Sequence, residues 1–230
     1  MVFFHKNIEY NFPSSLSEFT LGQRIAFDNM YSDQIKELQE SVFKKDENGE
    51  DIEADEIDVM LMTIAIASMN FSFFSGIPLQ EVQDEISVDD VLNVYYACFH
   101  QINEQQESLE LESEFVWNDE IWNLEAPELS YESKITFNEL ITSKQIVKQM
   151  SEVSASNWQG LLFLCAIYLK KENEVFNEAW MQENSERVQL MKSLPMDIAL
   201  HVAFFLQSSM TSYMKTFQSL KAVELAKDPI

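Results

Sequence analysis

The stretch Ile57-Asp-Val-Met-Leu-Met-Thr-Ile-Ala-Ile-Ala-Ser-Met-Asn-Phe-Ser-Phe-Phe-Ser75 decides the fold class of this chain. Its apolar residues fall on every side of a helix with 3.6 residues per turn, a pattern typical of a central buried helix rather than a surface one. Gly76 follows at the position where a left-handed residue ends many helices, and Pro78 opens the next turn. The longest apolar stretch, from Val59 to Phe74, is interrupted by polar residues and is expected to be too short for a membrane span. We expect a buried helix over 57–75.

Helix-initiation signals recur on both sides of this stretch. Thr20 with Gln23, and Thr136 with Glu139, form capping boxes, in which each side chain of the pair bonds the backbone N–H of the other residue. The segment 87–90 (Ser-Val-Asp-Asp) caps a further helix. The whole chain of 230 residues has four Gly and five Pro, which leaves few turns for a many-stranded β-sandwich. Long helices with few loops are therefore expected.

Two short regions have strand-like alternation instead. Residues 2–12 alternate loosely and predict a short strand or extended arm. In 109–126, apolar residues alternate with Glu around the turn signal Asn118-Asp119, which predicts the one β-hairpin of the chain, with its acidic face to solvent. We expect a mainly α fold: a helical domain with a small β-hairpin and a short N-terminal extended arm. It divides into three segments of one compact unit, which are an N-terminal helical half (1–108), an acidic β-hairpin region (109–134) and a C-terminal helical half (135–230).

The charge of the chain limits its partners. The formal net charge is −24 at pH 7 and the sequence pI is about 4.3. Such a surface repels nucleic acid phosphates and anionic lipid headgroups, so we expect neither direct nucleic acid binding nor membrane binding. A deliberately acidic DNA mimic is a rarer alternative. Partners with basic surfaces are favoured, and the N-terminus lacks the basic and apolar regions of a signal peptide, which predicts cytoplasmic synthesis.

The sequence contains no recognisable catalytic or metal-binding motif. A nucleophile usually needs a histidine base, and the chain has three histidines, which are His5, His100 and His201. His100 and Glu104 share one helix face but lack the further ligands of a metal site, and His201 is expected to be a satisfied core or interface histidine. Cys98 and Cys165 lie in apolar runs and are expected to be buried thiols. We predict no catalytic residues, no cofactor and no metal ligands.

A stripe of methionine and aromatic residues follows the last apolar helix, which is expected to start at Pro195. Two interpretations remain open for it. The stripe either packs into the core, or its distal part extends past the core as a contact helix for a partner, a use to which adaptable Met and aromatic side chains are suited. The candidate partner-binding residues are Met210, Tyr213, Met214, Phe217 and Leu220.

Three segments of the chain resemble motifs of one family of tailed-bacteriophage proteins, in the same order. Ser15-Leu-Ser-Glu-Phe-Thr-Leu-Gly-Gln23 resembles the opening of that family. Leu161-Leu-Phe-Leu-Cys-Ala-Ile-Tyr-Leu169 is similar to its apolar helix, and Leu190-Met-Lys-Ser-Leu-Pro-Met-Asp-Ile-Ala-Leu200, followed by Phe204-Phe205, is similar to its closing motif. The chain departs from the family at His201, where the family tends to have Gly, and in the more acidic hairpin region.

This family occurs in large tailed phages, including the crAss-like group, and its members are tail-assembly chaperones or structural components near the neck and tail. The resemblance implies no catalytic residues. It implies a non-enzymatic virion structural or morphogenesis protein of the neck–tail region, made in the host cytoplasm and located in the virion. Its expected partners are portal, ring or tail subunits, or further copies of itself in a ring. The alternatives are a transient tail-assembly chaperone or internal cargo protein, and an enzyme with an unrecognised carboxylate site.

Overall fold

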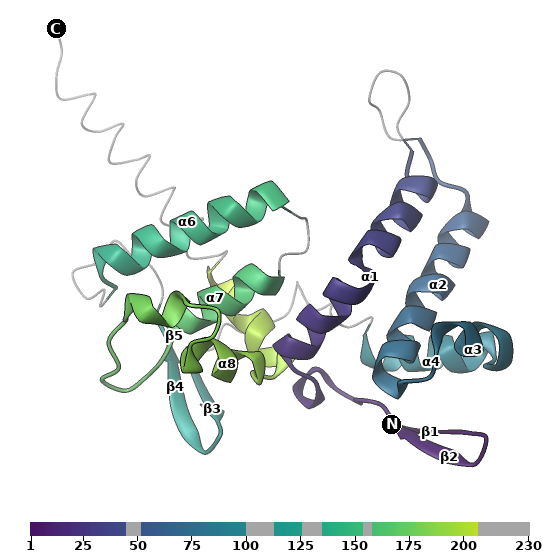
Figure 1. Cartoon of the computed structure of the whole chain (residues 1–230), viewed down its shortest axis with the longest axis horizontal. Coiled ribbons are helices and arrows are strands. Elements are labelled where there is room, and N and C mark those ends of the chain that lie inside the picture. Colours follow the sequence, from purple (N-terminus) through teal and green to yellow (C-terminus); the bar gives the residue numbers. More distant parts are fainter. Residues whose placement is uncertain (45–51, 100–112, 126–134, 154–157, 207–230) are drawn as a thin grey trace, which may run out of the picture. The chain divides into compact units, whose positions relative to one another are not determined.

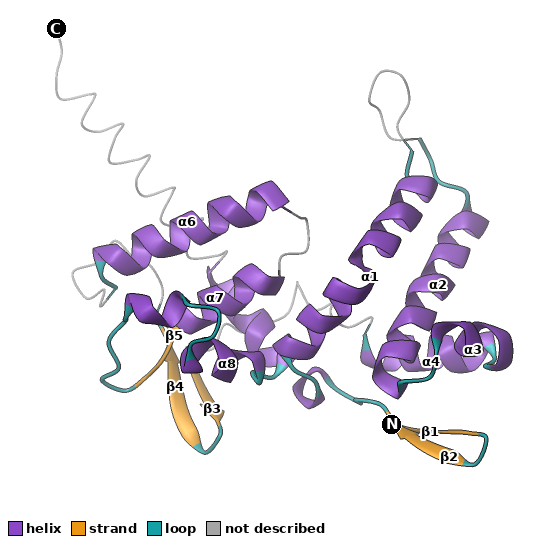
Figure 2. Ribbon diagram, in the orientation of Figure 1, coloured by secondary structure: helices purple, strands orange, loops and turns teal. Residues whose placement is uncertain are grey.

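The computed structural model describes residues 1–44, 52–99, 113–125, 135–153 and 158–206 (Figure 1). Helices dominate these residues and two small antiparallel sheets accompany them (Figure 2). The expected mainly α class with a small β-hairpin is confirmed. Tertiary contacts divide the chain into two compact units. Unit 1 comprises 1–19 and 23–107, and unit 2 comprises 20–22 and 108–230.

The described part of unit 1 contains a hairpin and helices α1 to α4. Its elements are β1 (Val2–His5), β2 (Ile8–Asn11), the 3-10 turn η1 (Leu16–Glu18), α1 (Leu21–Val42), α2 (Glu56–Ser75), α3 (Leu79–Glu85) and α4 (Val88–Cys98). The expected extended arm is in fact the hairpin β1–β2, so the chain has a second hairpin that the sequence did not predict. Its turn residues Lys6 and Asn7 have φ of 48° and 63°. Lys-Asn is a weaker hairpin-turn signal than Asn-Gly or Asp-Gly. The alternation of residues 2–12 therefore predicted one extended segment without a turn.

The helix ends of unit 1 follow their capping residues. Gly76 ends α2 with φ 73°, and its N–H donates to the Ser72 carbonyl at 2.8 Å. The Ser87 hydroxyl accepts from the Asp90 N–H at 3.1 Å and starts α4. These contacts join residues a few positions apart, which is why the sequence predicted them.

The core of unit 1 forms around the C-terminal half of α2. Phe71 is fully buried, and the rings of Phe3 and Phe12 pack against it with centroids 5.1 and 4.7 Å away. The expectation of a helix buried along its whole length is wrong, because residues 67–72 are buried while the first turns of α2 are exposed. A helix that is apolar on every side can be buried, but only along the part of its length that neighbouring elements cover.

Unit 2 combines a three-stranded sheet with a helical layer. Its elements are β3 (Glu114–Trp117), β4 (Glu120–Leu124), α6 (Phe137–Val153), α7 (Trp158–Tyr168), β5 (Leu169–Lys171), the 3-10 turn η3 (Glu178–Met181), α8 (Glu186–Lys192) and a helix over Met196–Leu206. The predicted hairpin is confirmed, with Asn118 and Asp119 in its turn at φ 54° and 59° and Trp117 paired with Glu120. The sequence did not predict β5, which continues directly from α7 and pairs with β4.

The capping box at the start of α6 is also confirmed. The Thr136 N–H donates to the Glu139 carboxylate at 2.5 Å, and the Glu139 N–H donates to the Thr136 hydroxyl at 3.3 Å. Residues 20–22, which start α1, contact the segment after α8 within unit 2. The Leu21 N–H donates to the Leu194 carbonyl at 2.9 Å, and Thr20 forms a β-bridge with Pro195.

Candidate functional site

The residues predicted from sequence to bind a partner, Met210, Tyr213, Met214, Phe217 and Leu220, lie outside the described residues, as do His100 and Glu104. His201 is half-buried in unit 2, with Nδ1 3.1 Å from the Asp197 carbonyl oxygen and its ring centroid 5.7 Å from that of Phe115. The expectation of a satisfied histidine is confirmed. Two features that the sequence did not single out stand out instead, both in unit 1.

The first feature is an exposed apolar surface where α1 ends and α2 begins. The Ile52 N–H donates to the Lys44 carbonyl at 2.9 Å, which places the two ends of the connection side by side. Five large apolar side chains are each about half exposed there. We call them the apolar end: Phe43 (54% exposed), Ile52 (49%), Ile57 (63%), Met60 (53%) and Leu61 (55%).

Helical spacing makes three of these residues a continuous stripe. Ile57, Met60 and Leu61 stand at i, i+3 and i+4, so they share one face of α2. The packing between α1 and α2 lies further along the helices, where Phe27 and Tyr31 of α1 form a cluster with Met69 of α2. The apolar end is therefore left outside the core of unit 1, although its residues are as apolar as those inside.

Acidic residues border the apolar end. Glu53, Asp55, Glu56 and Asp58 are all exposed, and the Asp55 carboxylate accepts from the Ile57 N–H at 2.8 Å as the N-cap of α2. The expectation that this run is too short for a membrane span is wrong: by length and composition α2 is long and apolar enough to cross a membrane, a test that buried core helices also pass. An apolar centre with an acidic border fits a protein surface with an apolar centre and a basic border.

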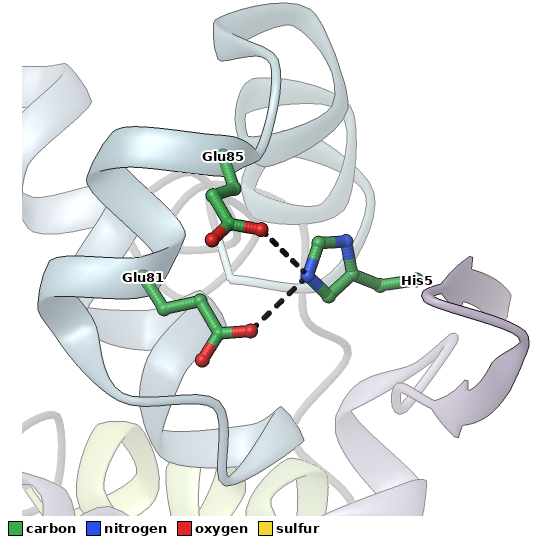
Figure 3. A group of neighbouring side chains, drawn as sticks. All are labelled: His5, Glu81 and Glu85. Atoms are coloured by element: carbon green, nitrogen blue, oxygen red, sulfur yellow. Dashed lines mark hydrogen bonds and ion pairs between the residues drawn. The ribbon is translucent and has the colours of Figure 1, made fainter.

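The second feature joins the N-terminal hairpin to α3 (Figure 3). His5 Nε2 lies 3.2 Å from Glu81 Oε1 and 3.7 Å from Glu85 Oε2. Lys6 Nζ lies 2.8 Å from each of the same two oxygens. Because hydrogen bonds from Lys6 and His5 favour its charged form, the pKa of Glu81 lies below its usual range, and the two carboxylates raise the pKa of Lys6. We call these four residues the hairpin clamp.

The hairpin clamp was missed because its halves are far apart in the chain. Glu81 and Glu85 are one helical turn apart on α3, a spacing visible in the sequence. Their partner His5 is 76 residues from Glu81. It reaches α3 because Phe3, on the same strand, packs against Phe71 of α2. No metal ligands were predicted from the sequence, yet this packing brings one imidazole and two carboxylates together.

Unit 2 buries a lysine between two carboxylates. Lys170 Nζ lies 2.5 Å from Glu139 Oε1 and 3.0 Å from Glu125 Oε2, and Lys170 and Glu139 are 3% and 1% exposed. Glu139 also accepts the capping bond from Thr136. Both carboxylates thus bind the same ammonium group, and their visible role is to hold β5, the segment after β4 and the start of α6 together.

A buried arginine has a similar role. Arg187 on α8 donates from Nε to the Ala166 carbonyl at 3.3 Å, from Nη2 to the Leu169 carbonyl and from Nη1 to Glu174. Its guanidinium also lies over the rings of Trp122 and Trp180, 4.9 and 4.5 Å from their centroids. These contacts tie the end of α7 to α8 and the sheet.

Comparison with known proteins adds no family. The chain matches no protein-family model, and neither the curated proteins nor the solved structures contain a match.

Proposed function

We propose that this chain is a non-enzymatic assembly protein of a tailed-phage virion that binds other subunits of the neck–tail region through its apolar end. The observation that supports this most is the stripe Ile57, Met60 and Leu61, exposed beside Phe43 and Ile52 at one end of a helical hairpin. The resemblance of residues 15–23 and 190–200 to a phage family supports the setting. Exposed contiguous apolar surface of this kind is typical of interaction sites.

Burial of the apolar end against a partner would contribute several kcal/mol to the free energy of binding. Removing a large aliphatic or aromatic side chain from water contributes about 1.5–3 kcal/mol. The five side chains are about half exposed, so covering them contributes roughly 4–7 kcal/mol in total. Association costs offset several kcal/mol. The apolar end therefore suits the centre of an interface whose border adds further contacts.

The acidic residues beside the apolar end favour a partner with basic residues around its binding surface. Glu53, Asp55, Glu56 and Asp58 lie at the start of α2 and outnumber the exposed Lys44 that follows Phe43, in a chain whose net charge is −24. Two copies meeting through this surface would bring acidic borders together, which is unfavourable. A portal, ring or tail subunit with a basic border around an apolar patch is the partner we propose.

The test is incorporation into particles. Phage particles are produced with the wild-type chain or with Met60→Glu/Leu61→Glu and purified, and copies of the chain per particle are counted by quantitative mass spectrometry. Both replaced side chains are exposed, so the variant should fold with an unchanged circular dichroism spectrum. We expect a fixed symmetric copy number for the wild type and at least a tenfold loss for the variant.

A charge-matched control separates the surface from the added charge. Val116→Glu/Val175→Glu also adds two negative charges, at side chains in unit 2 that are 75% and 73% exposed. It should be incorporated like the wild type. Equal loss in both variants would reject the apolar end as the docking surface. A wild-type chain that is abundant in infected-cell lysate but missing from particles would favour the transient chaperone.

A further inference from the structure

The hairpin clamp contains a set of metal ligands. One imidazole nitrogen of His5 and one carboxylate oxygen each of Glu81 and Glu85 lie within 4.8 Å of one another (Figure 3). They come from two elements, β1 and α3, so binding of one ion would join parts of the chain that are distant in sequence. His5 is 13% exposed at its side chain, and Glu81 is 31% exposed, so two of the three ligands are held partly inside the protein.

The ligand spacing suits a small tetrahedral ion. Zn²⁺ binds histidine nitrogen and carboxylate oxygen at about 2.0–2.2 Å, which places neighbouring ligand atoms of a tetrahedron roughly 3.3–3.5 Å apart. His5 Nε2 lies 3.2 Å from the Glu81 oxygen and 3.7 Å from the Glu85 oxygen. Both distances are close to this edge length, and the third pair, the two carboxylate oxygens, lies within 4.8 Å, so side-chain movements that bring these oxygens closer would complete three coordination bonds.

A cation already stands at this position. Lys6 Nζ is 2.8 Å from Glu81 Oε1 and 2.8 Å from Glu85 Oε2, the same two oxygens that face His5. The ammonium group thus takes the place a metal ion would occupy between the carboxylates. Lys6 is 53% exposed at its side chain, so its ammonium group can move into water when an ion replaces it, at the cost of two exposed ion pairs.

We propose that His5, Glu81 and Glu85 bind Zn²⁺, with water as the fourth ligand, in exchange for the Lys6 ammonium group. The bound ion would fasten the β1–β2 hairpin to α3 more firmly than the ion pairs do. A single imidazole with two carboxylates favours zinc over Mg²⁺ and Ca²⁺, which prefer six or more oxygen ligands. This proposal concerns a different surface from the apolar end and does not rest on it.

The decisive experiment is a Zn²⁺ titration of the full chain by isothermal calorimetry, with the Lys6→Met variant beside the wild type. Removing the competing ammonium group should tighten zinc binding roughly tenfold, since two exposed ion pairs no longer need to be broken. A misfolded protein could not produce this gain. The His5→Ala variant should lose the site in both the wild-type and the Lys6→Met background, which also excludes zinc bound at the other two histidines.

Two variants of α3 test whether the ion is bound specifically. Glu85→Gln removes a ligand, whereas Asp84→Asn removes the same charge from the neighbouring exposed position of the same helix. We expect zinc affinity to fall more than tenfold for Glu85→Gln and less than twofold for Asp84→Asn. Equal losses would mean diffuse attraction to an acidic surface and would overturn the proposal. Unchanged or weaker binding in Lys6→Met would overturn it as well.

Discussion

Replacing Lys170 by Met should destabilise unit 2 by about 3–5 kcal/mol, because it removes one partner of a buried ion pair. Lys170 and Glu139 are 3% and 1% exposed, and their charged atoms are 2.5 Å apart. Without the ammonium group, Glu139 stays inside unit 2 without its counter-charge. Glu125, the second carboxylate, is 25% exposed at its side chain and can regain water, so Glu139 dominates the cost.

Glu139→Gln should cost less, about 1–2 kcal/mol. Lys170 then keeps Glu125 at 3.0 Å, and glutamine can still accept the capping bond from the Thr136 N–H. The double variant Lys170→Met/Glu139→Gln contains no buried charge at this site. Its loss should therefore fall at least about 1 kcal/mol below the sum of the two single losses.

Tryptophan fluorescence during urea unfolding measures this directly. All four tryptophans of the chain, Trp117, Trp122, Trp158 and Trp180, belong to unit 2, so the signal reports the unit that carries the pair. Leu162→Ala, a fully buried position in α7 without charge, is the control and should cost about 2–5 kcal/mol and add to Lys170→Met. Strict additivity of Lys170→Met and Glu139→Gln would refute the reasoning that the two residues act as a buried pair.

Three further results are expected. Arg187→Lys should lower the free energy of unfolding of unit 2 by about 2–3 kcal/mol, because lysine cannot bridge two carbonyls while lying over Trp122 and Trp180. Thermal unfolding measures this loss, and an unchanged midpoint would contradict the prediction. Gly22→Ala should lower the free energy of unfolding by about 1–3 kcal/mol, since the new Cβ would lie 2.7 Å from the Lys192 carbonyl oxygen. Urea unfolding of the variant measures the loss, and wild-type stability would show that the backbone moves apart at no cost. Burial raises the pKa of both cysteine thiols, so Ellman's reagent at pH 8 should label them only after unfolding, and rapid labelling of the native chain would disprove their burial.

Features whose physical cause lies within a few residues could be predicted from the sequence. Gly76, Ser87 and the Thr136–Glu139 box all stand at the helix ends they were expected to make. The turn at Asn118-Asp119 also holds, because both residue types tolerate a positive φ. The Lys6–Asn7 turn escaped prediction because the first of its residues carries no such preference.

The exposure of individual side chains and the contacts between residues distant in the chain could not be predicted from the sequence. The run 57–75 has one apolar character throughout, yet its first turns are exposed and residues 67–72 are buried. Only the lengths and positions of the elements around α2 distinguish the two halves. The apolar end therefore could not be separated from the core by composition, although the acidic residues within 53–58 mark the exposed start of α2.

The sequence by itself determined the helical class, the helix ends and an acidic surface that favours basic partners, because local hydrogen bonding and net charge depend on residue type and spacing. Tertiary structure alone decided that His5 meets Glu81 and Glu85, and that Lys170 is buried with Glu139. These groups lie tens of residues apart along the chain. Their meeting depends on how aromatic and aliphatic side chains pack beneath them, such as Phe3 against Phe71 in unit 1, and no local pattern encodes that packing.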